Sequence, residues 1–337
     1  MRTTIIDVAA LAGVSIKTVS RVLNHEPNVR AATRDKVNEA VNKLGYRPNL
    51  QARQLKGTRS YLIGLICGEK LGSYAGPAQL GAIEACRSRG YHLVVETCDA
   101  ASQDPAVKLA QLLRDTTLDG LLLLPPFGDL PSVTQMVRAH GLPFCSFSPK
   151  EVQDDAYTVR MDDEAAAYEM TTYLIELGHR QIGFIKGDVR HAATDHRYAG
   201  FRRAMRERQL EVLDEHVQQG DFSYRSGIAA ANRLLDGEHR PSAVFASNDD
   251  MAAAVVSVAY RHGLVIPREL SVAGFDNSDF SRKIWPTVTT VHQPVYEMGE
   301  SAVSQLLDGI AGDQTTSVKT LSYRLLFRES TAPPAAE

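Results

Sequence analysis

From Tyr61 onward, short apolar runs alternate with helical segments, and this alternation restricts the fold more than any other feature of the chain. The apolar run at 61–67 (YLIGLIC), for example, is followed by a predicted helix at 77–89. Buried strands that alternate with helices form βαβ units, in which parallel strands are covered by helices on both faces. The alternation is long enough for two such sheets, one before about residue 160 and one after it.

The remaining segments are assigned from the same pattern of apolar residues. Further strands are expected at 91–97, 120–125, 143–148, 157–161, 181–186, near 217, and at 242–247, 270–275, 289–293, 317–321 and 323–328. Further helices are expected at 105–115, 131–140, 164–177, 196–209, 224–235, 249–262 and 296–307. The last segment, 331–337 (TAPPAAE), is expected to be disordered.

The first 45 residues lack this alternation, and their pattern of apolar and capping residues predicts three short helices. The first is capped by Thr4, the second starts after Ser15, and the third runs over 34–44 between Thr33 and Gly45. In VAALAGVSIKTVSRVLN, the first two are separated only by a tight turn, which Gly13 permits because no Cβ opposes a positive φ. This arrangement is typical of a helix-turn-helix, and the alternative is a plain αα-hairpin in a larger bundle.

Charge is distributed unevenly along the chain. Residues 1–60 contain eleven basic and four acidic side chains, although the whole protein carries a net charge of −3. A basic N-terminal segment on an acidic body indicates that nucleic acid contacts this segment and not the body. The alternative is that the basic residues form a solvated face. The second helix could then enter a major groove, with Ile16, Lys17 and Arg21 reaching base edges or phosphates.

Several function classes find no support in the sequence. The four cysteines form no CxxC pair or Cys/His cluster, so neither a disulfide framework nor a metal site is expected. Asp162, Asp163 and Glu164 lie at a helix start, where acids favour the dipole, and therefore do not indicate a metal. No GxSxG, P-loop, GxGxxG or HExxH motif is present, so we expect neither an enzyme nor a cofactor. The N-terminus is not a signal peptide and no run is long enough to span a membrane, which predicts a cytoplasmic protein.

Polar and aromatic residues follow many of the predicted strands. Ligands of open α/β sheets bind beyond the carboxyl ends of strands, so these residues are candidates for a binding site. Guanidinium, carboxylate, amide and aromatic groups suit a polyhydroxylated ligand. The alternatives are helix caps or turns for Asn248 and Asp276, core packing for Phe222, and a surface ion pair for Arg197. His191 and His196 flank this region and are expected at the surface.

A series of motifs resembles the lac repressor (LacI/GalR) family of bacterial transcription regulators. At the N-terminus these motifs are DVA (7–9), AGVS (12–15), TVSRVLN (18–24) and LGYRPN (44–49). The resemblance continues to the end of the chain, and its later motifs are LGHR (177–180), GF (200–201), SND (247–249), MA (251–252), SVAGFD (271–276) and TTV (289–291). It therefore covers essentially the whole sequence.

This resemblance implies an α/β fold with an N-terminal all-α helix-turn-helix head and a body with two lobes. The body would be of the type I periplasmic-binding-protein kind, with parallel sheets. The implied domains are the DNA-binding head at 1–46, a hinge helix and linker at 47–60, and an effector-binding and dimerisation domain at 61–330. Within the last, the N-lobe would comprise about 61–160 plus 293–320, and the C-lobe about 161–292 plus 321–330.

The segment LQARQLKG (50–57) would be a hinge helix that folds on DNA, since two turns are too short to persist alone. By resemblance, Leu55 is a wedge inserted in the minor groove beside Ala52, while the alternative is an ordinary polar linker. The residues expected to contact DNA are Thr4, Ser15, Ile16, Lys17, Thr18, Ser20, Arg21, Asn24, Asn28, Tyr46, Asn49, Ala52, Arg53, Leu55 and Lys56.

The implied partners are double-stranded operator DNA, a small-molecule effector and a second copy of the chain, with no membrane. The effector candidates are Ser73, Tyr74, Phe127, Ser146, Arg197, Phe222, Asn248, Asp276 and Gln293. Ser146 stands where some sugar-responsive members carry an acid, so the ligand can differ from theirs. The expected function is repression controlled by a sugar. A cytoplasmic sugar-binding protein, or a regulator that responds to a purine or another metabolite, stays open as an alternative.

Overall fold

The computed structural model describes residues 3–23, 28–46, 59–68, 74–98, 104–237, 239–312 and 316–335. The chain divides into two compact units, Met1–Tyr61 and Leu62–Glu337, which are described separately. Among the described residues, no helix combines the length and apolar character that a bilayer crossing requires.

Three helices form the N-terminal unit: α1 (Ile5–Ala12), α2 (Ile16–Leu23) and α3 (Ala31–Leu44). Small and β-branched side chains from all three fill its core: Val8, Ala9, Val19, Val22, Val37 and Ala40. Gly13 has a φ of 63° and ends α1, which confirms the predicted turn. Gly45 likewise ends α3 with a φ of 57°. The predicted start of α3, at residue 34, was wrong by three residues. Ala31 and Ala32 are good helix formers and extend the helix back to its N-cap, Arg30.

The second unit contains two six-stranded sheets. The first has the order β11-β5-β4-β3-β1-β2 and the second β12-β10-β9-β8-β6-β7. Every neighbouring pair is parallel except β10 and β12. The strands are β1 (Leu62–Gly68), β2 (His92–Cys98), β3 (Gly120–Leu123), β4 (Phe144–Phe147), β5 (Tyr157–Arg160), β6 (Ile182–Lys186), β7 (Val217–Gln219), β8 (Ala243–Ala246), β9 (Ser271–Asp276), β10 (Thr289–His292), β11 (Val318–Thr320) and β12 (Arg324–Leu326).

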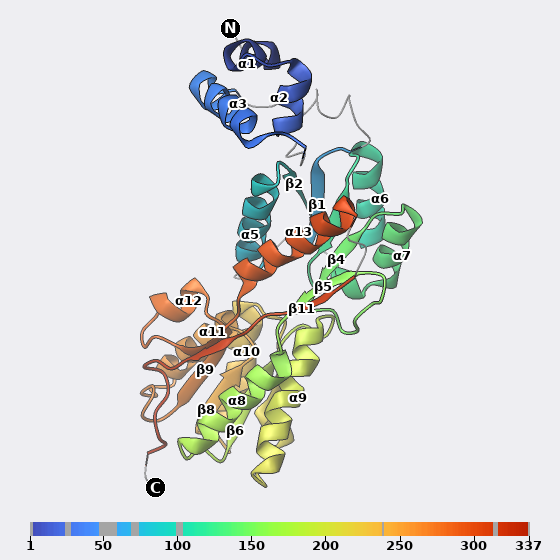
Figure 1. Cartoon of the computed structure of the whole chain (residues 1–337). Coiled ribbons are helices and arrows are strands. Elements are labelled where there is room, and N and C mark those ends of the chain that lie inside the picture. The colour runs from blue at the N-terminus through green and yellow to red at the C-terminus, as the bar shows by residue number, and fades with distance from the viewer. Residues whose placement is uncertain are drawn as a thin grey trace. The chain divides into compact units, whose positions relative to one another are not determined.

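Helices cover both faces of each sheet, as the alternation predicts (Figure 1). The N-lobe, defined as the first sheet with its helices, contains α5 (Ala75–Ser88), α6 (Pro105–Asp115), α7 (Pro131–Ala139) and α13 (Val295–Ala311). The C-lobe, defined as the second sheet with its helices, contains α8 (Asp163–Glu176), α9 (Ala192–Glu207), α10 (Tyr224–Asp236), α11 (Asp249–Arg261) and α12 (Asp279–Lys283). Two short 3₁₀ turns, Phe127–Asp129 and Asp214–His216, complete the described elements.

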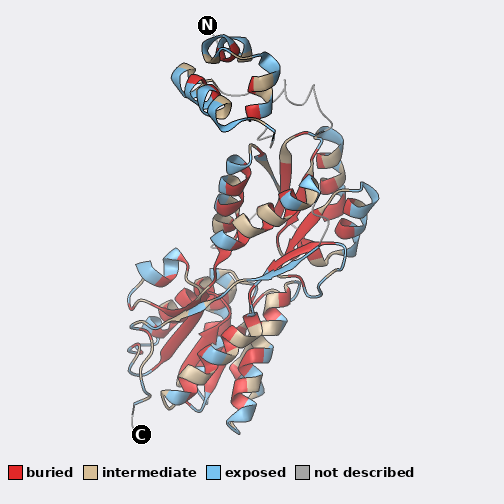
Figure 2. Ribbon diagram, viewed as in Figure 1, coloured by how far each residue is buried: buried red, intermediate tan, exposed pale blue. Residues whose placement is uncertain are grey.

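Alternate residues of the C-lobe strands enter two separate cores. Phe184 and Phe245 pack under α8 and α9, whereas Ile185 and Val244 pack under α10 and α11. Strand side chains alternate between the faces of a sheet, so each strand serves both layers and must be apolar throughout. Figure 2 shows this pattern as a concentration of buried residues on the strands and on the helix surfaces that face them.

Two further sequence expectations about elements were wrong, and one helix was not expected. The helix expected at 196–209 begins at Ala192, four residues earlier, and α12 was not expected because its five residues DFSRK carry little apolar pattern. The C-terminal segment is not disordered at Thr331 and Ala332. Ser271 donates from Oγ to the carbonyl of Ala332, and Ala332 N–H donates back to that hydroxyl. These bonds fix a segment whose own sequence has no strand or helix pattern.

Candidate functional sites

In the N-terminal unit, α2 has one buried and one exposed face. Val19 and Val22 enter the core, whereas Ile16, Lys17 and Arg21 are exposed. Ile16 is 41% exposed, so its apolar side chain is available to a surface that docks on this face. At the start of the helix, Ser15 Oγ lies 2.9 Å from Thr18 Oγ1 and accepts from the Thr18 N–H at 3.2 Å. The exposed face of α2 is thus an ordered surface of cationic, hydroxyl and apolar groups.

The other predicted DNA contacts are divided between described and undescribed residues. Thr4 is exposed and forms a capping box with Asp7, Ser20 is half-buried on α2, and Asn28 is exposed. Tyr46 packs against the helical core, and burial raises its pKa. Asn24, Asn49, Ala52, Arg53, Leu55 and Lys56 lie outside the described residues, as does Ser73 from the effector set.

Arg197 on α9 is the centre of a buried polar cluster in the C-lobe. Its Nε donates to Oδ1 of Asp163 at 2.8 Å, and its Nη1 lies 3.8 Å from Oδ1 of Asp276. The same Nη1 donates to the carbonyl of Ser247 at 2.5 Å, and the guanidinium carbon lies 3.7 Å from the Phe275 ring centroid. Arg197 is only 4% exposed, so its charge needs these partners. Arg197 thus lies among the candidate site residues, and it also forms the ion pair that was its alternative role. This ion pair is buried and does not lie at the surface.

Asp276 and Gln293 are brought together at the ends of adjacent strands. Gln293 Nε2 donates to Asp276 Oδ1 at 2.5 Å. β9 and β10 are parallel neighbours, and Asp276 pairs in register with His292, the residue before Gln293. Asp276 has a φ of 113° and Asn277 one of 60°, a backbone conformation that non-glycine residues rarely adopt. The surrounding contacts hold these two strained residues in place.

Phe222 and Asn248 form the adjacent part of the site. Asn248 Nδ2 donates to the Phe222 carbonyl at 2.9 Å, while its Oδ1 accepts from Met251 N–H and caps α11. Asn248 therefore caps a helix, which was the alternative to a binding role that the sequence analysis gave for it. The Phe222 ring centroid lies 5.9 Å from the Arg197 guanidinium carbon and 5.4 Å from the His191 ring. Burial lowers the pKa of His191 to about 4, so its imidazole is neutral at pH 7.

The N-lobe candidates differ in their surroundings. The Tyr74 hydroxyl is buried and has no hydrogen-bond partner among the described residues, and the same holds for Ser146 Oγ. Burial raises the pKa of Tyr74, with a further contribution from the Asp163 carboxylate of the C-lobe. Phe127 has no exposed surface and packs in the N-lobe core. Two orphaned hydroxyls are the kind of buried polar atom that a ligand or water satisfies.

Sequence reasoning missed the contacts of two residues that build this site. Asp163 was interpreted as a helix-start acid, but it is 4% exposed and holds Arg197. Asp249, which has no exposed surface, accepts from Thr290 Oγ1 and from Ser278 N–H, both at 2.6 Å. These bonds connect α11 to the segment that follows Asp276. No sequence signal identifies such pairings, since the partners are 29 to 41 residues apart.

The described residues contain no group of three or more His, Cys, Asp or Glu side chains with metal-binding geometry. Of the three acids at 162–164, Asp162 accepts from Ala165 N–H as a helix cap and Glu164 pairs with Arg203. The acids at this helix start thus have structural partners: Asp162 caps the helix, whereas the ion pairs of Asp163 and Glu164 were not predicted.

Comparisons with known proteins match both units. Residues 4–49 match the family described as bacterial regulatory proteins, lacI family, and residues 171–331 match a periplasmic binding protein-like domain. Catabolite control protein A of Priestia megaterium is 33% identical over 98% of this chain and 100% of its own length. The HTH-type transcriptional repressor PurR of Serratia proteamaculans is 35% identical over 98% of this chain and 97% of its own.

Two solved structures show the same arrangement of elements. A complex of the transcriptional regulator CelR with cellobiose has a TM-score of 0.76 at 33% identity, covering 98% of this chain and all of that one. A lac repressor dimer bound to operator and the anti-inducer ONPF has a TM-score of 0.77 at 26% identity, with the same coverage. The fold predicted from sequence, a helix-turn-helix head with a two-lobed periplasmic-binding-like body, is confirmed.

Proposed function

We propose that this chain, which belongs to the lacI family of bacterial DNA-binding transcriptional regulators, is a repressor. In this proposal its affinity for operator DNA is controlled by a sugar. In this proposal, residues 1–46 bind DNA, 47–60 form the hinge, and 61–330 bind the effector and dimerise. The protein acts on DNA in the cytoplasm as a homodimer and catalyses no reaction.

The DNA-binding role of α2 is supported by its exposed face. Ile16, Lys17 and Arg21 project from a helix whose other side is locked in the core. A recognition helix needs this rigidity, because side chains must reach base edges without losing much conformational freedom on binding. Cationic groups supply the counterion-release contribution to affinity, and Ile16 can contact a thymine methyl.

The buried polar cluster of the C-lobe supports a neutral, hydroxyl-rich effector. Arg197 is already matched by the carboxylates of Asp163 and Asp276, so the cluster offers little net positive charge to an anion. Asp276 and Gln293 can accept from and donate to sugar hydroxyls, while Phe222 offers an apolar face to ring C–H groups. The pairing of Arg197 with Asp276 beside Phe222 is the observation that carries this proposal.

Regulation follows if the two lobes close on the effector. Tyr74 of the N-lobe already lies close enough to Asp163 of the C-lobe for that carboxylate to raise its pKa. A ligand that contacts both lobes favours the closed form by its difference in affinity for the two forms. Closure in each subunit of a dimer would change the spacing of the two hinge segments and hence operator affinity.

A thermal-shift screen tests the effector class, with sugars and nucleobases as separate arms. A sugar that raises the melting temperature of the wild type but not of Asp276→Ala supports the proposal. A purine that alone gives this result would assign the alternative effector class. Stabilisation that persists in the variant would place the ligand elsewhere.

A further inference from the structure

The C-terminal half of α9 carries two arginines whose charges are not neutralised by acids. Elsewhere on or just after this helix, arginines are matched with carboxylates: Arg197 with Asp163, Arg203 with Glu164 and Arg208 with Glu176. Arg202 and Arg206 form no ion pair within the part of the chain that the structure describes, and both are exposed.

These two arginines are four residues apart and therefore share one face of α9. Like charges at this spacing destabilise a helix. Arg202 has an additional neighbour in the Tyr198 ring, whose centroid lies 5.9 Å from its guanidinium carbon, and Lys186 Nζ lies 3.8 Å from the same ring. The face thus gathers positive charge, and no ion pair to Arg202 or Arg206 is formed by the residues that the structure describes.

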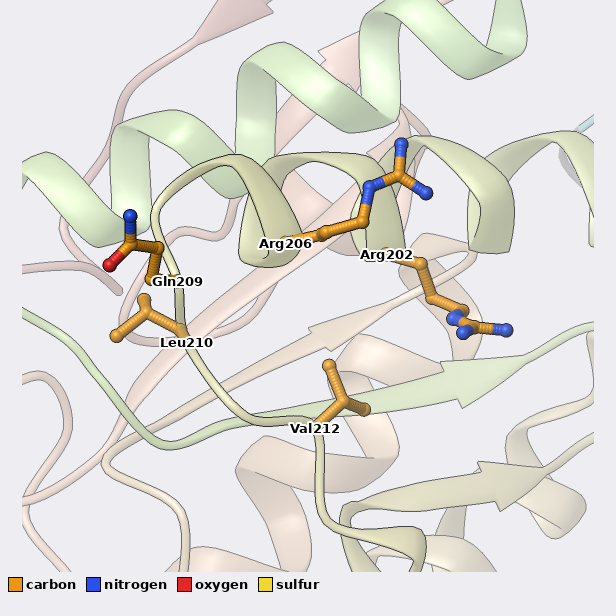
Figure 3. A pocket seen from close by; sticks show the side chains of 5 residues that line it. All are labelled: Arg202, Arg206, Gln209, Leu210 and Val212. Carbon is orange, nitrogen blue, oxygen red and sulfur yellow. The ribbon is translucent and has the colours of Figure 1, made fainter.

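Arg202 and Arg206 line a cavity of about 320 Å³ together with Gln209, Leu210 and Val212 (Figure 3). Leu210 and Val212 pack against the core beneath α8 and α9, which gives the cavity an apolar side. Figure 3 shows the two arginine side chains on successive turns of the helix and the two aliphatic ones along the segment that follows it. Cationic and apolar walls in one cavity suit an anion that carries an apolar group.

Gln209 contributes an amide to the cavity from a position that favours glycine. It has a φ of 56° and follows the last turn of α9, where its N–H donates to the Arg206 carbonyl and Leu210 N–H donates to that of Met205. Such helix ends usually carry glycine at the left-handed residue, because a Cβ there is unfavourable. The side chain at this position lines the end of the cavity away from the two guanidinium groups (Figure 3).

We propose that this cavity binds a small organic phosphate ester, with its phosphate on Arg202 and Arg206 and its organic group on Leu210 and Val212. Guanidinium groups match phosphate oxygens in a planar, bidentate geometry that no single lysine offers. The volume lies near the lower end of small-molecule sites, of about 300–1,000 Å³, which limits the organic group to a few carbon atoms or one ring. The site is distinct from the Arg197 cluster and does not depend on the proposed effector.

Calorimetric titration of phenyl phosphate into the full chain, without DNA, tests the proposal. The wild type should bind saturably, and R202A/R206A should bind about tenfold or more weakly. The matched control R225A/R240A removes the same charge from exposed arginines of the same lobe and should bind like the wild type. Because both double variants keep the basic head and the Arg197 cluster, a loss confined to R202A/R206A assigns the ligand to this cavity.

Phenol and inorganic phosphate separate the two halves of the site. Phosphate alone should bind more weakly than phenyl phosphate, and phenol should not bind measurably. No binding by the wild type, unchanged binding by R202A/R206A, or an equal loss in both double variants would overturn the proposal. Equal affinity for phosphate and phenyl phosphate would overturn the role of Leu210 and Val212. Thermal melting of each variant verifies that the substitutions, all at exposed positions, leave the fold intact.

Discussion

Arg197 and Asp163 form a buried ion pair, with Nε of the arginine 2.8 Å from Oδ1 of the aspartate and about 5% of either side chain exposed. The pair joins α9 to the first turn of α8. It places a guanidinium group beside Asp276 and Phe222, where the effector is proposed to bind.

Replacing Arg197 by Met should lower the free energy of unfolding by about 3–5 kcal/mol, because it leaves Asp163 buried without a counter-charge. Urea denaturation measures this loss. The double variant Arg197→Met/Asp163→Leu should recover much of the stability, since removing both charges removes the desolvation cost as well. If the double variant is less stable than the single one, the uncompensated charge is not the cause.

Gly187→Ala should weaken effector binding about tenfold without removing any polar group. A Cβ at residue 187 would overlap the ring of Phe222, which must then move away from Arg197. Isothermal titration with the effector found by screening measures the change. Gly237→Ala is the matched control, because its Cβ would meet only the Arg233 carbonyl at an ordinary 3.7 Å. Unchanged affinity in Gly187→Ala would exclude the Phe222 ring from the site.

Asp249 predicts a pH dependence of stability. Burial raises its pKa from 3.8 to about 6, so between these values the folded protein binds more protons at this group than the unfolded chain does. Stability that Asp249 contributes at low pH is therefore lost as the pH rises through about 4 to 6. The advantage of the wild type over Asp249→Asn in unfolding free energy should be roughly 1–3 kcal/mol larger at pH 4 than at pH 7. A difference that stays constant over this range would contradict the raised pKa.

Lys17→Ala should weaken DNA binding at every sequence and reduce the slope of log affinity against log salt by about 1. The reason is that one fewer phosphate contact releases one fewer counterion. Fluorescence anisotropy at several salt concentrations gives this slope. Lys36→Ala removes the same charge from α3 and should leave the slope unchanged. Equal effects of the two substitutions on the slope would mean that Lys17 of α2 makes no phosphate contact that Lys36 of α3 lacks.

The sequence predicted the architecture well because the two strongest signals are local. Gly13 between two short helices and the alternation of strands and helices each depend on residues close in sequence. The boundaries that failed also have local causes. Ala31 and Ala32 extend α3 without a sidechain cap, and α12 is too short to carry a periodic pattern.

The candidate site was predictable only in part, because strand ends mark where a ligand binds but not which way a side chain points. That reasoning placed Asp276 and Gln293 together, and they share a hydrogen bond. It also selected Phe127, whose ring is instead buried in the N-lobe core after the chain turns at 127–129. The partners Asp163 and Asp249 depend on contacts across α8, α9 and α11, which no local pattern encodes.

We expect the head to bind specific DNA and a ligand in the body to change this binding. The direct measurement is the affinity of the purified protein for promoter fragments of its own genome, with and without the stabilising sugar, over a range of salt concentrations. We expect one or a few fragments to bind far more tightly than the rest, with an affinity that falls as salt rises and when the sugar is added. Equal affinity for all fragments, unaffected by any ligand that stabilises the body, would contradict the account.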